Sequence, residues 1–561
     1  MQLLPFLGLA LLFAVLVVIG AFTNYSPVPF WDAWDGTIHF YFSIQDGDRW
    51  AWLEQHNEHR IVLSRLLFWM DLAWFGGTAK FLIVCNYLLA ALSYGLLWWL
   101  LKLRLDQPQD YFARCVLSCV MACLMFSWAQ AENLVWGFQS QFFFAQSLPL
   151  LSFYLLYRSS LPASASGRYF ALACLAGVLS AGSIASGILA LPLLILLALL
   201  LSLSRRRVAV LALLSVLMLF AYLHGYARPE GDGGSLGKAL SEQPIEFAQY
   251  LLMYLGAPLA LTEPGTPTMA LLAGGVMVVL SLIFAAKALR NRQANALSLS
   301  LLVFVLYIGG TAVGTTGGRL GLGVLQAVSS RYTTPILTAW SVLLILAAPF
   351  LARVIRLKPG LSLGALVLLP LVFTALQFAT LRDRSERLFG PMVSALALEL
   401  GVRDAEQIQR VYPRLEIVMP IAQRAAAQDE SVFADPRIHD ASHLIGQRMP
   451  ADGAPGCIGY LDTMFLLEDP RWVRIRGWLF APQHSAAPQS LTLLDAERRV
   501  VGYAITGLPR TDVAAAAGSK ARLGGYVGYL LEPMREARQL IVRGRAPDCE
   551  TTISLAPAPM P

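Results

Sequence analysis

The segment 31–35, Trp-Asp-Ala-Trp-Asp, carries the residues best suited to chemistry in this sequence. Its carboxylates, Asp32 and Asp35, are three residues apart, which places both on one face of a helical turn. The tryptophans beside them suit the headgroup zone of a membrane. A carboxylate that is partly desolvated there becomes more basic and can take a proton from a sugar hydroxyl. The alternative is that one acid caps a helix and the other is solvated.

A second polar run, 55–60, follows in the same stretch between apolar segments. We expect four of its side chains to hydrogen-bond a substrate: His56, Glu58, His59 and Arg60. Imidazoles and carboxylates are also ligands for divalent cations such as Mg²⁺, Mn²⁺ or Ca²⁺. A cation site here would draw on Asp32, Asp35, His56, Glu58 and His59. The third interpretation is a structural hydrogen-bond network.

The short connection around 128–139 combines amides, an acid and tryptophans, as sugar-contacting surfaces do. The candidate substrate-binding residues are Glu132, Asn133, Trp136 and Gln139. An aromatic belt with solvated amides is an equally good interpretation of the same residues.

Glycines and arginines gather in 315–332. Arginine presents a planar fork suited to phosphate, and glycine lets the backbone approach an anion closely. We therefore predict that Arg331, Arg319 and Tyr332 contact the phosphate of a lipid. The alternative is that the arginines pair with acids of the loop 23–78. In another loop, His224, Arg228 and Glu230 are weaker candidates.

The composition of the chain indicates that membrane-spanning helices position these residues. The chain has 561 residues, of which 56% are hydrophobic and 14% charged, with a mean hydropathy of +0.57. This excludes a soluble enzyme. About eleven apolar runs are long enough to span a bilayer: 3–22, 79–101, 112–128, 139–157, 169–183, 187–203, 208–224, 269–286, 296–314, 333–352 and 361–380. The net charge of +7 reflects basic loops, so no nucleic-acid partner is expected.

The basic loops fall in every second connection, which predicts a cytoplasmic N-terminus and an outward-facing C-terminal part. The loops 23–78, 129–138, 224–268 and 315–332 would then face outward. The apolar stretch 247–261 is short and interrupted by Gly256 and Pro258, and we interpret it as re-entrant or interfacial.

Three regions are expected: a membrane domain 1–380 that includes the loop 23–78, a helical segment 381–446, and a β-sandwich within 447–561. The sandwich is indicated by alternating runs at 472–480, 490–494, 500–505, 526–531 and 539–542. It could bind carbohydrate through Trp472, Trp478 or Tyr526, or serve only as packing. Cys457 and Cys549 flank it and could form a disulfide or remain buried thiols.

These features resemble the GT-C superfamily of integral-membrane glycosyltransferases. The likeness rests on the architecture and on 31–35, 55–60 and 330–332; it is greater to bacterial members and more distant to arabinofuranosyltransferases. It implies a multi-pass protein of the bacterial inner membrane with a periplasmic C-terminal domain. It also implies a polyprenyl-phosphate sugar donor, a glycan, lipid or protein acceptor, and a base that maps onto Asp32 or Asp35. No strict Asp-x-Asp is present, which leaves the base and any metal open.

The predicted reaction is an inverting displacement at the anomeric carbon of the lipid-linked sugar. Two other functions fit many of the same features. One is a polymerase or ligase of lipid-linked oligosaccharides, which would not need the carboxylates Asp32 and Asp35. The other is a flippase or transporter, which would be expected to show repeated halves and charges at mid-membrane.

Overall fold

The computed structural model describes residues 2–162, 165–227, 234–260, 267–451 and 453–555. The chain forms two compact units. The first comprises Met1–Thr23, Asp48–Leu67 and Phe81–Arg382; the second comprises Asn24–Gly47, Phe68–Lys80 and Asp383–Pro561. The loop that we expected to belong to the membrane domain is therefore divided between the units. The expected segments 381–446 and 447–561 fold together in the second unit.

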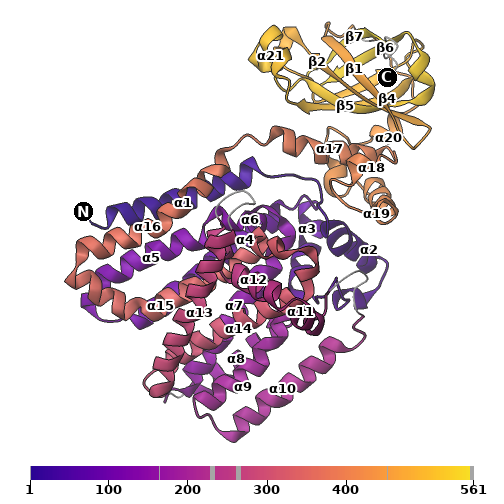
Figure 1. Cartoon of the computed structure of the whole chain (residues 1–561). Helices are drawn as coiled ribbons and strands as arrows, with labels where there is room; N and C mark the ends of the chain where they lie inside the picture. The colour runs from indigo at the N-terminus through magenta and orange to yellow at the C-terminus, as the bar shows by residue number, and fades with distance from the viewer. Residues whose placement is uncertain (1, 163–164, 228–233, 261–266, 452, 556–561) are drawn as a thin grey trace. The chain divides into compact units, whose positions relative to one another are not determined.

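The first unit is a helical bundle, drawn in indigo to orange in Figure 1. Its helices are α1 (Leu4–Thr23), α4 (Lys80–Arg104), α5 (Tyr111–Met125), α6 (Ala131–Val135), α7 (Ser140–Ser160), α8 (Ser166–Ser180), α9 (Ala190–Leu200), α10 (Arg205–Leu223), α11 (Leu236–Glu242), α12 (Pro244–Leu255), α13 (Pro267–Arg290), α14 (Ala296–Arg319), α15 (Thr333–Leu357) and α16 (Pro359–Phe378). Helix α3 (Val62–Phe75) runs from this unit into the second.

All eleven expected apolar runs are helical. Among the described residues, eight helical segments are long and apolar enough to cross a membrane: Leu4–Thr23, Lys80–Arg104, Pro108–Val135, Arg205–Leu223, Pro267–Arg290, Ala296–Leu322, Ser330–Leu357 and Pro359–Leu381. Helices α8 and α9 are apolar but shorter. The chain bends between them where Gly187 lies against Ser180: an added Cβ would stand 1.8 Å from the Ser180 carbonyl oxygen. The 12-residue α12 is too short to cross.

Helix packing in this unit depends on small residues and on buried polar contacts. Helices α12 and α13 cross with their backbones in contact, since a Cβ on Gly256 or Gly274 would lie 1.9 Å from a carbonyl oxygen of the other helix. Deeper in the bundle, Thr334 donates to Gln130 Oε1 at 2.6 Å, and Asn133 Nδ2 donates to Thr334 at 2.7 Å. These bonds tie the start of α15 to the segment that contains α6.

The second unit is built on one antiparallel sheet of seven strands, in the order β1-β2-β5-β4-β3-β6-β7. Its strands are β1 (Ile458–Leu466), β2 (Trp472–Phe480), β3 (Ser490–Leu494), β4 (Val500–Leu508), β5 (Gly525–Leu531), β6 (Gln539–Arg545) and β7 (Cys549–Ser554). The five expected strands are present, and β1 and β7 are added at the edges. The sheet curls so that these edges meet: Gly456 bridges Glu550 and the Cys457 amide donates to Glu550.

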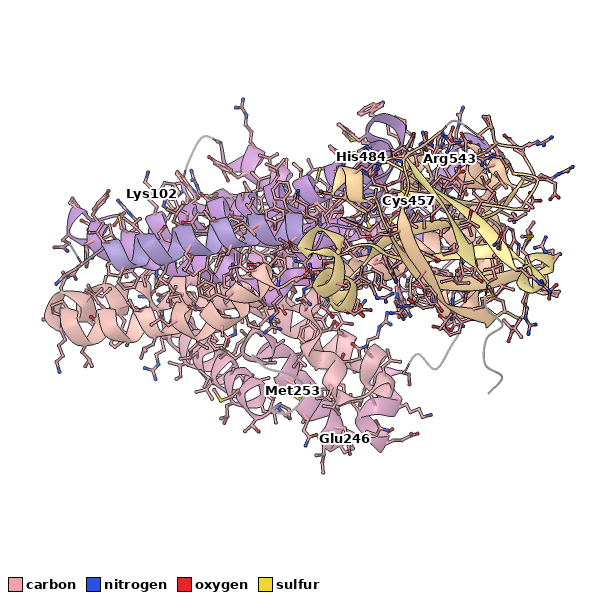
Figure 2. All side chains as sticks on the ribbon, turned by 90° about the horizontal axis from the view of Figure 1, so that it is seen from above. Lys102, Glu246, Met253, Cys457, His484 and Arg543 are labelled. Carbon is pink, nitrogen blue, oxygen red and sulfur yellow. A yellow bond between two sulfur atoms is a disulfide. The ribbon has the colours of Figure 1, made fainter. Side chains whose placement is uncertain are left out.

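One face of the curled sheet encloses an apolar core. Side chains alternate between the two faces of each strand, and those that point into this core include Val473, Ile475, Leu493 and Leu540. The disulfide between Cys457, labelled in Figure 2, and Cys549 joins the starts of β1 and β7, with 5.4 Å between their Cα atoms. This bond closes the end of the sheet at which both strands begin.

The other face packs on the helices of the second unit. These helices are α2 (Phe40–Gln45), α17 (Ser385–Glu399), α18 (Ala405–Ile408), α19 (Leu415–Ala427) and α20 (Ala441–Leu444), and α17 contacts β4 and β5. Helix α21 (Thr511–Ala517) instead packs through Val513 beside Phe480 of β2. Trp472 and Tyr526 are buried, with 6% and 0% of their surface exposed. Neither can be an exposed carbohydrate platform, because strand alternation directs both rings into apolar cores.

Candidate functional site

The segment 31–35 has an unusual backbone in the second unit. Trp31 has a left-handed φ of 47°, and its amide donates to the Val411 carbonyl at 2.7 Å. A π-helix, Trp34–His39, follows directly, with Ala33 at its N-cap. Both features cost conformational energy and are over-represented at functional sites. Helical residues begin at Ala33, and the carbonyl of Asp32 before it accepts from the Gly36 amide at 2.8 Å, so the helix-cap alternative stays open for Asp32.

The structure brings Asp32 and Asp35 together. Both are half-buried, and their nearest carboxylate oxygens lie within 4.8 Å of each other. Asp35 accepts from the Gly36 amide at 3.0 Å and from the Tyr412 hydroxyl at 3.2 Å. Burial raises the pKa of Tyr412 to about 12, and the negative charge of Asp35 adds to this effect. Tyr412 therefore remains a protonated donor that orients the carboxylate of Asp35.

Two carboxylate oxygens at this separation fit a hard divalent cation, which prefers oxygen ligands. Asp32 and Asp35 would hold such an ion, which would supply positive charge near a reacting oxygen. His56, Glu58 and His59, the other expected ligands, belong to the first unit.

In the first unit, the run 55–60 forms a tight turn in which His56 and His59 exchange backbone hydrogen bonds at 2.8 and 2.9 Å. The His56 ring is buried and packs on Phe138 with 5.4 Å between ring centroids. His59 Nδ1 accepts from the Ala185 amide at 3.2 Å. These contacts favour the structural interpretation for both histidines.

Arg60 also has structural contacts. Its guanidinium donates to the carbonyl oxygens of Tyr222 at 2.9 Å and His224 at 2.6 Å, and also to that of Leu53. It thus holds the end of α10 against this turn. Arg228 and Glu230 lie outside the described residues.

Glu58 is the member of this run that meets the arginines. Its carboxylate pairs with Arg319 at the end of α14, with 2.9 Å between Oε2 and Nη2. Arg331, at the start of α15, lies 3.8 Å from Glu132 Oε1 and donates to the Ser329 hydroxyl at 3.3 Å. Each of the four side chains keeps 30–37% of its surface exposed.

Tyr332 lies among these four charges and interacts electrostatically with all of them. Its ring is 9% exposed and packs on Tyr254 at 5.3 Å between centroids. We call Glu58, Glu132, Arg319, Arg331 and Tyr332 the arginine cluster. Its residues come from three loops that are far apart in the sequence. The side chains of Arg319 and Arg331 remain partly exposed to solvent although each has a carboxylate partner.

The remaining candidates of the 128–139 connection are Asn133, Trp136 and Gln139. Asn133 is fully buried and donates to the Arg331 carbonyl at 2.8 Å. Trp136 stacks on Phe138 with 5.6 Å between centroids. Gln139 is 1% exposed, too enclosed for direct contact with a sugar. Asn133 therefore holds the backbone at Arg331.

Two contributors were missed from the sequence. Tyr412 orients Asp35 although it lies 377 positions away, and Tyr254 supports Tyr332 from the short helix α12. An isolated tyrosine in an apolar or mixed segment gives no signal of such a role, because packing alone explains it as well.

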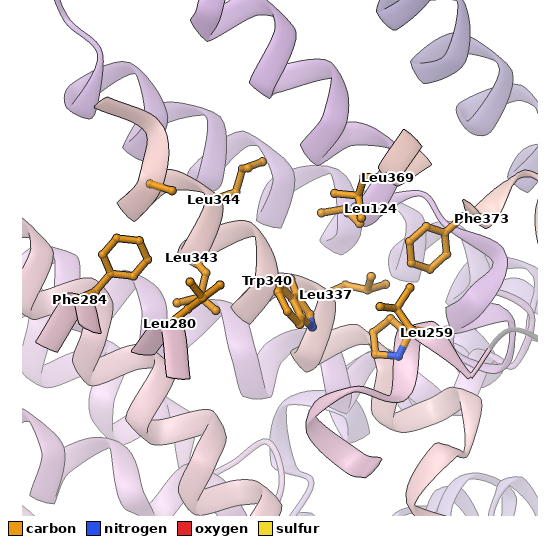
Figure 3. A pocket seen from close by; sticks show the side chains of 12 residues that line it. Leu124, Leu259, Leu280, Phe284, Leu337, Trp340, Leu343, Leu344, Leu369 and Phe373 are labelled. Carbon is orange, nitrogen blue, oxygen red and sulfur yellow. The ribbon is translucent and has the colours of Figure 1, made fainter. Parts of the chain in front are cut away.

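An apolar cavity of about 210 Å³ opens in the first unit (Figure 3). The side chains of Trp340, Leu343 and Leu344 on α15 line it, together with Leu280 and Phe284 on α13. Because almost no polar surface faces this cavity, it suits a hydrocarbon chain.

The fold is that of a polytopic helical membrane protein with a C-terminal antiparallel β domain. No protein-family model and no curated protein matches the sequence. Among solved structures, the chain is similar to the archaeal oligosaccharyltransferase AglB from Archaeoglobus fulgidus, in complex with an inhibitory peptide and a dolichol-phosphate. The sequences are 12% identical, the match covers 73% of this chain and 59% of that one, and the TM-score is 0.43.

Proposed function

We propose that this protein is a membrane glycosyltransferase. In this proposal it transfers a sugar from a polyprenyl-phosphate-linked donor to a glycan, lipid or protein acceptor of the cell envelope, at the periplasmic face of a bacterial inner membrane. The observation that carries the proposal is the arginine cluster. Two guanidinium groups stand at the ends of two candidate membrane helices, partly exposed and imperfectly paired, where the phosphate of a lipid could compete for them.

The apolar cavity between α13 and α15 supports the same substrate class. An isoprenoid chain needs a hydrocarbon-lined site, and α15 contributes to that site as well as beginning beside Arg331. Helix α15 would thus contact the lipid tail and also begin next to the residues that bind the phosphate.

The reaction requires one proton acceptor and one stabilised leaving group. Asp32 or Asp35 takes the proton of the acceptor hydroxyl, and the oxygen of that hydroxyl forms a bond to the anomeric carbon. The bond from that carbon to the phosphate oxygen breaks, and its electron pair stays on the phosphate. Arg331 and Arg319 offset the charge that develops there. Displacement from the opposite side inverts the anomeric centre.

The test is turnover of radiolabelled polyprenyl-phosphate sugars by the purified protein, with a lipid extract as the acceptor pool. We expect Asp32→Asn or Asp35→Asn to lower turnover by about 10²- to 10⁴-fold, as loss of a general base does. Asp106→Asn, an exposed acid of the first unit, is the matched control. Full activity in both variants of the Asp32–Asp35 pair would exclude them as the base.

A second candidate, a ligase or polymerase of lipid-linked oligosaccharides, is favoured by the same arginines. It would lose activity in Arg331→Ala but keep it in the Asp32→Asn, Asp35→Asn double variant. Movement of the labelled lipid across vesicles without a glycosylated product would indicate a flippase.

A further inference from the structure

The second unit contains a cavity of about 480 Å³ with a lining of mixed polarity, and no part of the proposed reaction uses it. Segments far apart in the chain form it: 25–27, 78–80, 385–392, 431–437 and 506–507. Its volume lies in the range of small-molecule sites, roughly 300–1,000 Å³. Such a site has room for one or two sugar rings.

The charged residues that line this cavity are Lys80, Arg437 and Asp435, which leaves one net positive charge. Arg437 binds Asp435 through two hydrogen bonds, Nε to Oδ1 at 2.9 Å and Nη2 to Oδ2 at 2.7 Å. The Arg437 side chain remains 34% exposed. Its fork is thereby held in one orientation by Asp435, with the Nη1 edge left to donate elsewhere.

Lys80 adds a second cation to the lining of this cavity. In the described part of the chain, its ammonium has no carboxylate within ion-pair distance and lies over the Tyr25 ring, 5.5 Å from the centroid. Its charge helps to lower the pKa of Asp435, so Lys80 lies near that carboxylate and the guanidinium of Arg437. An unpaired ammonium and an oriented guanidinium edge form a site for an anionic group.

The rest of the lining suits the body of a sugar. Phe389 and Met392 are buried apolar side chains, Tyr25 offers a ring face, and Ser26 a hydroxyl. Gly507 has φ +129° and its missing Cβ would stand 3.1 Å from Phe389, so a side chain there would be strained and would crowd that ring. Apolar faces beside hydroxyl groups match the mixed surface of a pyranose.

We infer that this cavity binds an anionic saccharide, in which a carboxylate or phosphate meets Lys80 and Arg437 while the ring lies against Tyr25 and Phe389. The anion could belong to a uronic acid or to a phosphorylated sugar, since both present oxygen acceptors to the same donors. The inference does not depend on the proposed transferase reaction, because it requires only binding.

The test is calorimetric titration of the full chain in detergent with cellobiouronic acid, glucose 1-phosphate and neutral cellobiose. We expect at least one of the acidic ligands to bind about tenfold or more tightly than cellobiose, and to weaken as salt rises. Preference for cellobiouronic acid would identify a uronate site, and preference for glucose 1-phosphate a phosphosugar site.

Three variants locate the binding. Lys80→Met should weaken the acidic ligand about tenfold, and Ala434→Phe, which adds a ring to the cavity lining without changing charge, should abolish binding. Lys520→Met removes an exposed lysine elsewhere on the second unit and should change nothing. Binding of cellobiose as tight as that of the acids, no binding of either acid, or indifference to both Lys80→Met and Ala434→Phe would overturn the inference. Thermal unfolding of each variant checks that the fold is intact.

Discussion

Two sets of arginine–carboxylate contacts, one in each unit, differ in how completely their charges are paired. In the second unit, Arg474 binds both oxygens of Asp404 at 3.1 and 3.0 Å and Glu406 at 2.6 Å. The Tyr529 hydroxyl donates to Asp404 at 2.9 Å, and the Arg474 and Asp404 side chains are 10% and 2% exposed. Both carboxylate oxygens of the buried Asp404 thus accept strong hydrogen bonds within the protein.

The arginine cluster of the first unit is different. Arg319 has a single short contact to Glu58, and Arg331 lies 3.8 Å from Glu132. Each side chain keeps about a third of its surface exposed. The comparison teaches that a saturated, buried set braces a fold, whereas an open set leaves charge for a ligand. Four predictions test this distinction.

The largest effect should come from the saturated set. Arg474→Leu leaves Asp404 buried without its main partner, which should lower the free energy of unfolding by about 3–5 kcal/mol. The free energy of unfolding is measured by chemical denaturation of the purified protein, with proteolytic cleavage of the β domain as the signal of unfolding. Arg476→Leu is the control, because Arg476 is an exposed arginine on the same strand, β2. A loss below about 1 kcal/mol in Arg474→Leu would show that burial is not what separates the two sets.

The open set should behave in the opposite way. Arg331→Ala should lower turnover by about 10²- to 10³-fold, as loss of a charge-stabilising donor does, yet cost at most about 1 kcal/mol of stability. Arg290→Ala, an exposed arginine at the end of α13, is the control and should leave turnover unchanged. If Arg331→Ala unfolded the protein without a specific kinetic effect, the cluster would be structural.

Glu58 competes with a ligand for Arg319 in this interpretation. Glu58→Gln removes a contact worth about 1 kcal/mol or less, so the KM for the lipid donor should fall by up to about fivefold. Steady-state kinetics at constant ionic strength measures it. A higher KM would mean instead that Glu58 holds Arg319 in its working position.

The smallest effect concerns pH. The hydrogen bond from Arg474 lowers the pKa of Glu406, and partial burial opposes this only in part. A carboxyl whose folded pKa is depressed adds stability that is fully present above its unfolded pKa, roughly 4.3. That stability is lost as the pH falls through the lower folded value. Because Glu406 is 63% exposed, we expect less than about 1 kcal/mol, visible as a shallower acid unfolding curve in Glu406→Gln.

Much of the fold could be predicted because it depends on local patterns. All eleven apolar runs proved helical, although only eight helical segments of the described residues are long and apolar enough to span a membrane, and alternation predicted five strands of the sheet. The edge strands β1 and β7 were missed because their residues are largely exposed and carry little alternation. The division of the loop 23–78 between the two units has no local sequence signal either, because it depends on which residues each part of the loop packs against.

For the candidate site, residue type selected the candidates but could not predict their contacts. The arginines, Asp32, Asp35, His56, His59 and Arg60 were all selected by their chemistry, and the structure shows that the last three also hold a turn and a helix end. A side chain's donors are the same whether they bind a substrate or a backbone carbonyl. Only the tertiary arrangement shows which of these partners is present.

The sequence by itself therefore determined the membrane class, the helices and most strands, because hydropathy and periodicity act over a few residues. The sequence left the pairing of charges open, with acids of the loop 23–78 as one alternative for the arginines, and the tertiary structure decided it. Glu58 and Arg319 are 261 positions apart, and Asp35 and Tyr412 are 377 apart. Such contacts form only once each unit has folded, since chain separation of this length carries no preference for any one partner.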